Sequence, residues 1–148
     1  RYKGRPVVLS DGTRIGKNDI LMKIHLHNVY LCKQMGELTN DVQKGKFIYR
    51  SVEKSLPGLA DYVRNHPREA EIKGIMGITF LAKGSSRLGF DTFPLVRGLY
   101  KLYKWTTLFP IYFISVSRVS KQTLRKQTPQ YLFMSKERLL QQYGSQCH

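Results

Sequence analysis

The sequence is short of carboxylates, of cysteine and of long apolar runs, and each shortage narrows the classes of protein it can represent. Ten Asp and Glu residues stand against 25 Lys and Arg, which gives a formal charge of +15 and a self-repulsion that a bound polyanion would relieve. Two cysteines, Cys32 and Cys147, make neither a disulfide framework nor a zinc site and favour a reducing, cytosol-facing environment. The longest apolar run, 108–116, contains Pro110 and is about half the ~18 residues that span a bilayer.

Familiar catalytic motifs are also missing from the sequence. It contains no Walker-type phosphate loop, no dinucleotide fingerprint, no Gly-x-Ser-x-Gly elbow and no Cys-x-x-Cys pair. The scattered carboxylates offer no recognisable acid/base pair. The segment 84–87 is compatible with phosphate binding at a helix start, but a polar loop beside a short helix is the simpler interpretation. We therefore expect no cofactor and no resident metal, and the sequence leaves open whether the protein is an enzyme.

Length and composition indicate one globular domain. The chain has 148 residues, of which 41% are hydrophobic and 24% charged, values typical of a folded protein. Neither an internal repeat nor a convincing linker divides it, so we expect a single basic α+β domain over residues 1–148. Because the chain begins with Arg1 and not with methionine, we expect a fragment or a processed product.

Extended segments are predicted in five parts of the chain. The run 6–9 is followed by turn residues at 10–13. Residues 20–27 alternate between two faces, as in a half-buried strand. The segment 72–81 is almost uncharged, which is typical of a central strand, and its glycines permit close approach of another backbone. Shorter strands are expected at 90–93 and 131–134.

Helices are predicted between these strands. Apolar spacing indicates a helix over 39–55 and a second one capped by Ser55, with Pro57 near its first turn and Leu59, Tyr62 and Val63 facing inward. Pro67 and the residues before it should end this helix. A short helix is expected at 82–88, and a terminal helix should begin at Ser135 and end at Gly144. Together these elements predict a small mixed or antiparallel sheet with several helices packed on it.

The strongest functional pattern is a basic aromatic segment. Residues 92–136 contain no carboxylate and eight Lys or Arg. Cations recur at helical spacing, which predicts anion-binding faces; they are Arg97, Lys101, Lys104, Arg118, Lys121 and Arg125. Interleaved rings could form an apolar interface with lipid or with unstacked bases; they are Trp105, Phe109, Tyr112 and Phe113. The alternative is that these rings pack in a core and the cations form its solvated rim.

A second, weaker pattern lies at the end of the strand predicted over 20–27. His25 and His27 share one face, and Asn28 follows them, so two imidazoles are available to a metal or for acid/base chemistry. Strand histidines on the wetter face more often form hydrogen bonds with neighbours. No third metal ligand can be identified from the spacing.

Short segments spread over most of the chain carry a family resemblance: RPV at 5–7, LSDGT at 9–13, IHLHN at 24–28, GITFL at 77–81, LGF at 88–90 and MSKERLL at 134–140. They resemble the YkoP-like domain family of Gram-positive spore-forming bacteria. The resemblance implies a relation to domains associated with polysaccharide deacetylases, and hence work at the cell envelope. It implies no catalytic motif for these positions, so His25, His27 and Asn28 belong either to a shared site or to shared structure.

Our leading hypothesis is a basic binding module that contacts an anionic surface, either phospholipid headgroups or an acidic cell-envelope polymer. One alternative is an enzyme that acts on a phosphorylated or glycan substrate through His25 and His27. Another is non-specific nucleic-acid binding, although no helix-turn-helix, zinc-finger or RNA-recognition signature is present. We expect the protein in the cytoplasm or on the cytoplasmic face of the membrane.

Overall fold

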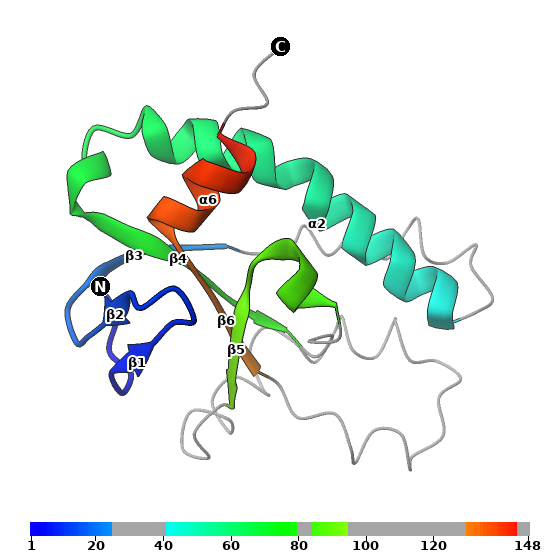
Figure 1. Cartoon of the computed structure of the whole chain (residues 1–148), viewed down its shortest axis with the longest axis horizontal. Helices are drawn as coiled ribbons and strands as arrows, with labels where there is room; N and C mark the ends of the chain where they lie inside the picture. Colours follow the sequence, from blue (N-terminus) through cyan, green and yellow to red (C-terminus); the bar gives the residue numbers. More distant parts are fainter. Residues whose placement is uncertain (25–40, 80–83, 95–129, 145–148) are drawn as a thin grey trace.

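The computed structural model describes residues 1–24, 41–79, 84–94 and 130–144. A four-stranded mixed sheet has the order β3-β4-β6-β5, in which β3 and β4 are parallel and the other pairs antiparallel (Figure 1). Its strands are β3 (Ile20–Lys23), β4 (Ile72–Thr79), β6 (Gln130–Ser135) and β5 (Asp91–Pro94). A separate antiparallel pair is formed by β1 (Val7–Val8) and β2 (Arg14–Ile15). The predicted α+β class with a mixed sheet is confirmed.

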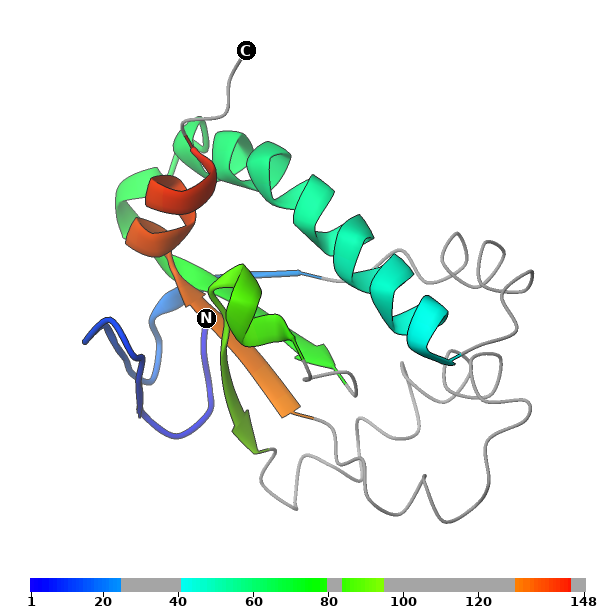
Figure 2. The same cartoon turned by 45° about the vertical axis from the view of Figure 1, so that its right-hand side comes forward.

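Apolar side chains cover both faces of the four-stranded sheet. The helices α2 (Asp41–Arg64) and α6 (Lys136–Tyr143) lie together over one face (Figure 2). On that face Ile20, Met22 and Ile24 pack against a core that includes Leu56 and Met134. The alternate residues of the sheet meet the N-terminal segment in a second core, formed by Tyr2, Leu9, Ile15 and Phe133 with Leu21 and Met76 packed against it. The two-residue alternation of the strands therefore divides the sheet side chains between two apolar layers.

The prediction that 72–81 contains a central strand is confirmed, because β4 pairs with β3 on one side and β6 on the other. Close approach of another backbone is confirmed at Gly74, whereas the nearest atoms at Gly77 belong to a side chain. A Cβ at Gly74 would collide with the carbonyl oxygen of Met134, and one at Gly77 would lie 3.0 Å from Cγ1 of Ile24. The backbone N–H of Ile24 donates a 2.8 Å hydrogen bond to the Met76 carbonyl, so the pairing with β4 continues past Lys23.

The two helices predicted over 39–64 are one continuous helix, α2, with Pro57 inside it. Ser55 does not cap a new helix; its hydroxyl donates a 2.7 Å bond to the Val52 carbonyl. An interior proline removes one helical hydrogen bond, and burial of Leu56, Ala60 and Val63 on the same stripe offsets that loss. The prediction that Tyr62 faces inward is wrong, because this residue is 59% exposed.

The remaining elements follow the sequence closely. Arg64 ends α2 just before the predicted stop at 65–67. The short helix expected at 82–88 is a 3-10 turn, η2 (Ser85–Leu88), ended by Gly89 at φ 89°; a second 3-10 turn, η1 (Glu69–Glu71), precedes β4. Ser135 caps α6 as predicted, accepting a hydrogen bond from the backbone N–H of Arg138. Within the described ranges, no helix combines the length and apolar character needed to cross a membrane.

Candidate functional site

Carboxylates in the described ranges are largely taken up by ion pairs within the protein. The pairs join Asp61 to Arg64, Glu71 to Arg68, Asp19 to Lys73, Glu69 to Lys136, and both Asp11 and Asp91 to Arg138. Exposed cations with no ion pair among the described residues include Lys17, Lys46, Arg50, Lys54 and Arg87. The described surface thus presents positive charge that no described carboxylate neutralises through an ion pair.

The most extensive polar network surrounds Arg138 and consists of Ser10, Asp11, Asp91, Ser135 and Arg138. The guanidinium group of Arg138 donates to the carbonyl of Gly89 at 3.1 Å, to Oδ2 of Asp91 at 3.3 Å and to the hydroxyl of Ser10 at 2.9 Å. Oδ2 of Asp91 also accepts from the backbone and hydroxyl of Ser10, each at 3.1 Å. The network ties the turn between β1 and β2 to β5 and to the start of α6.

Asp11 joins this Arg138 network to Ser135 and to the turn between β1 and β2. It accepts a hydrogen bond from the buried hydroxyl of Ser135 and another from the backbone N–H of Thr13 at 2.9 Å. Burial alone would raise the pKa of Asp11, but the hydrogen bonds from Ser135 and Thr13 and the charge of Arg138 together lower it. In the described part of the chain, every fully buried side-chain nitrogen or oxygen has a hydrogen-bond partner. We therefore assign the network a stabilising role.

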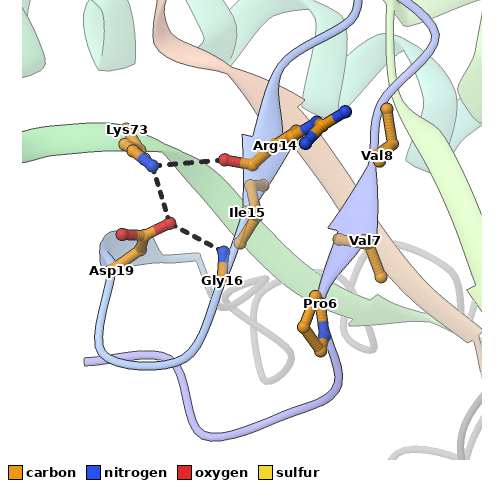
Figure 3. Close-up of a pocket in the computed structure, with 8 residues that line it drawn as sticks. All are labelled: Pro6, Val7, Val8, Arg14, Ile15, Gly16, Asp19 and Lys73. Carbon is orange, nitrogen blue, oxygen red and sulfur yellow. Dashed lines mark hydrogen bonds and ion pairs between the residues drawn. The ribbon is translucent and has the colours of Figure 1, made fainter.

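A hollow of about 420 Å³ lies beside β1 and β2, and its lining includes the ion pair between Asp19 and Lys73 (Figure 3). Oδ2 of Asp19 accepts a 2.7 Å bond from the backbone N–H of Gly16 and a 2.9 Å bond from Nζ of Lys73. Lys73 also donates to the carbonyl of Arg14 at 3.3 Å. The hydrogen bond from Gly16, followed by that from Lys73, lowers the pKa of Asp19. Asp19 neutralises Lys73, which leaves Arg14 as the one cation of this lining with no ion pair among the described residues. This hollow is therefore a weak place for an anion.

A second hollow, of about 390 Å³, lies between α2 and η2, and we call it the basic hollow. Its lining consists of Gly45, Lys46, Tyr49, Arg50, Glu53, Gly84 and Arg87. Lys46, Arg50 and Arg87 are exposed, and none of them forms an ion pair with a described residue. Three cations against one carboxylate make this hollow the best anion-binding candidate in the described part of the chain.

Sequence reasoning missed the basic hollow as a unit. It considered 84–87 as a phosphate-binding loop, and Gly84 and Arg87 do line the hollow. The other wall comes from α2, about forty positions earlier in the chain, and only the fold brings the two together. The helical spacing of Lys46, Arg50 and Glu53 was the signal available in the sequence.

The site residues predicted from the sequence all lie outside the described ranges. The histidine pattern, with His25, His27 and Asn28, falls within 25–40. The basic aromatic segment falls within 95–129 and contains Arg97, Lys101, Lys104, Trp105, Phe109, Tyr112, Phe113, Arg118, Lys121 and Arg125. Their roles stay predictions. Among the residues whose placement is described, no three His, Cys, Asp or Glu side chains gather into a group that could hold a metal ion.

Comparison with known proteins tests the resemblance noted above. The YkoP domain model matches residues 1–143. The chain is 46% identical over 143 residues to the "Uncharacterized protein YkoP" of Bacillus subtilis (strain 168), an alignment that covers 97% of this chain and 77% of that protein. No solved structure matches the chain, and neither match shows the implied relation to polysaccharide deacetylases. The chain belongs to the YkoP domain family.

Proposed function

We propose that this YkoP domain is a basic, non-catalytic binding module that contacts an anionic surface, with phospholipid headgroups as its principal target. The observation that supports this most is the division of charge. Carboxylates such as Asp11, Asp19 and Asp91 are held inside ion pairs, while the exposed cations around the basic hollow have no such partner among the described residues. A net charge of +15 then attracts anionic partners over the whole surface.

The basic aromatic segment gives the proposal its lipid component. Each Lys or Arg close to an anionic membrane contributes about 1 kcal/mol of attraction, and aromatic rings are favoured at the boundary between headgroups and acyl chains. The segment supplies both kinds of side chain within 97–126. An acidic cell-envelope polymer offers the same closely spaced anions without an apolar layer, and it would suit the resemblance to domains associated with polysaccharide deacetylases.

Flotation with liposomes tests this function. The protein should float with vesicles that contain phosphatidylglycerol, remain behind with pure phosphatidylcholine, and lose binding as salt rises. Replacing Arg97, Lys101 and Lys104 with Gln should weaken flotation. A matched variant, in which Lys3, Arg5 and Lys17 become Gln, loses the same charge and should bind better than the first variant.

Further lanes separate the other hypotheses. A soluble acidic polymer can be added to compete with the vesicles. If it displaces the protein more strongly than simple salt at the same concentration of negative charge, the polymer is the ligand. Displacement by nucleic acid, with a steep salt dependence, would support nucleic-acid binding. The enzyme hypothesis rests on His25 and His27, and it predicts stoichiometric metal in the purified protein that disappears in His27→Ala. Absence of flotation with every anionic vesicle would contradict the proposed function.

A further inference from the structure

We propose that the basic hollow between α2 and η2 is a subsite for a phosphate monoester. This inference rests on the proposed function, because it assigns one defined anionic group to a module that otherwise binds by charge. The hollow, about 390 Å³ in volume, is large enough for such a group. Its cations come from two segments that the fold brings together.

The α2 wall places a polar stripe along one face of the helix. Lys46, Tyr49, Arg50 and Glu53 are spaced at i, i+3, i+4 and i+7, so their side chains lie next to one another. Tyr49 is partly buried against the main core, which anchors the stripe to the sheet. A Cβ added at Gly45, near the start of α2, would meet no described residue within 4 Å other than the neighbouring backbone of the helix itself. No described side chain therefore covers this edge of the hollow.

The opposite wall is a short turn whose position is fixed from several sides. Ser85 and Leu88 are buried, and the carbonyl of Leu88 accepts a 3.0 Å hydrogen bond from the hydroxyl of Tyr143 in α6. Gly84 has φ 90°, a conformation that side chains disfavour, and an added Cβ would lie 3.6 Å from the ring of Tyr49. Exposed Arg87 is thus carried on an anchored turn that faces α2 across the hollow.

The charge of the hollow decides which anion fits it best. Lys46, Arg50 and Arg87 provide three positive charges and Glu53 one negative charge, which leaves a net charge of about +2 at neutral pH. A phosphate monoester carries about −1.5 to −2, whereas a phosphodiester or a carboxylate carries only about −1. Arginine also binds phosphate oxygens in bidentate fashion, and the hollow contains two arginines. The combination favours a terminal phosphate over the diester of an ordinary headgroup.

The test compares two lipids at matched surface potential. Phosphatidylcholine vesicles carry either phosphatidic acid, a monoester, or phosphatidylglycerol, a diester, and binding is measured for three proteins. The wild type is compared with a double variant, Arg50→Gln with Arg87→Gln, and with a control, Lys17→Gln with Lys54→Gln, that loses the same charge outside the hollow. Circular dichroism verifies that each variant is folded. In parallel, glycerol 3-phosphate is titrated while NMR follows the guanidinium signals of Arg50 and Arg87.

We expect the wild type and the control to prefer phosphatidic acid by about tenfold and the double variant to lose that preference. Equal binding to both lipids, with the double variant behaving like the control, would overturn the subsite and leave the binding module standing. Binding to neither lipid would contradict the proposed function. In that case, shifted arginine signals with glycerol 3-phosphate would support a subsite for a soluble phosphate monoester, and unchanged signals would overturn it.

Discussion

Ser135 donates a hydrogen bond from its hydroxyl to the carboxylate of Asp11, and so links two residues 124 positions apart. The same oxygen accepts a 3.1 Å bond from the backbone N–H of Arg138, which makes Ser135 the N-cap of α6. Ser135 has no exposed surface. One buried hydroxyl therefore begins the terminal helix and fixes the turn between β1 and β2 to it.

Ser135→Ala should lower the free energy of unfolding by about 1–2 kcal/mol, because it removes a helix cap and one hydrogen bond to Asp11. Urea denaturation measures the change. Ser51→Ala is the matched control, since among the described residues that hydroxyl donates to the carbonyl of Phe47 one turn earlier in α2, and it should change stability little. Equal effects of the two substitutions would contradict the role given to Ser135.

Arg138→Met should destabilise the protein by about 2 kcal/mol, since Asp11 and Asp91 would lose their shared cation. The value is smaller than for a fully buried pair, because the side chain of Arg138 is 20% exposed. Arg68→Met breaks the exposed pair with Glu71 and should destabilise the protein much less, because solvent screens that pair. Thermal or urea unfolding measures the loss of stability in both variants. A larger loss in Arg68→Met than in Arg138→Met would contradict the role given to Arg138.

Acid should destabilise the protein through Asp11 and Asp19, whose pKa values are lowered in the folded state. A carboxyl with a lowered folded pKa contributes stability above its unfolded pKa of about 3.9, and this contribution is lost as pH falls through the lower folded value. Urea midpoints measured from neutral pH into acid should therefore fall. The fall should be shallower in the double variant Asp11→Asn with Asp19→Asn. If the urea midpoints of the wild type and of the double variant fell equally with pH, acid destabilisation could not be assigned to Asp11 and Asp19.

Gly74→Ala should cost about 2 kcal/mol or more, since its methyl group would meet the backbone carbonyl of Met134 in β6. Gly58→Ala is the matched control within α2, where the new methyl group would meet no described residue within 4 Å apart from the helix's own neighbouring backbone. That substitution should stabilise the protein by about 0.5–1 kcal/mol through helix propensity. Opposite signs in chemical denaturation are the expected result, and a stable Gly74→Ala protein would contradict the close pairing of β4 and β6.

Local sequence signals were sufficient for most of the described fold. Alternation identified the strand beginning at Ile20, the apolar run identified central β4, and Ser135 identified the start of α6. The prediction of a new helix near Pro57 was wrong. Proline is favoured in the first turn of a helix, but burial of Leu56 and Ala60 stabilises one longer helix, α2, that continues through Pro57. The inward prediction for Tyr62 failed because two adjacent positions, Tyr62 and Val63, cannot both face one core, and Val63 occupies it.

The candidate site was less accessible to sequence reasoning. The cations of the basic hollow come from α2 and from η2, and no spacing rule predicts which distant segments a sheet brings together. The Arg138 network was missed for the same reason, although four of its five members, all except Asp91, stand in two segments, 9–13 and 134–140, that resemble the YkoP-like family. The sequence shows how many charges there are and how they are spaced. The fold decides which cations have no ion pair among the described residues.

The fluorescence of Trp105 tests the central claim most directly, because this is the only tryptophan in the sequence and it lies in the basic aromatic segment. Vesicles of phosphatidylglycerol and phosphatidylcholine should shift its emission to the blue, and added salt should reverse the shift. Phosphatidylcholine alone should leave the spectrum unchanged. Emission that does not respond to anionic vesicles at low salt would contradict the claim that this domain binds an anionic lipid surface through that segment.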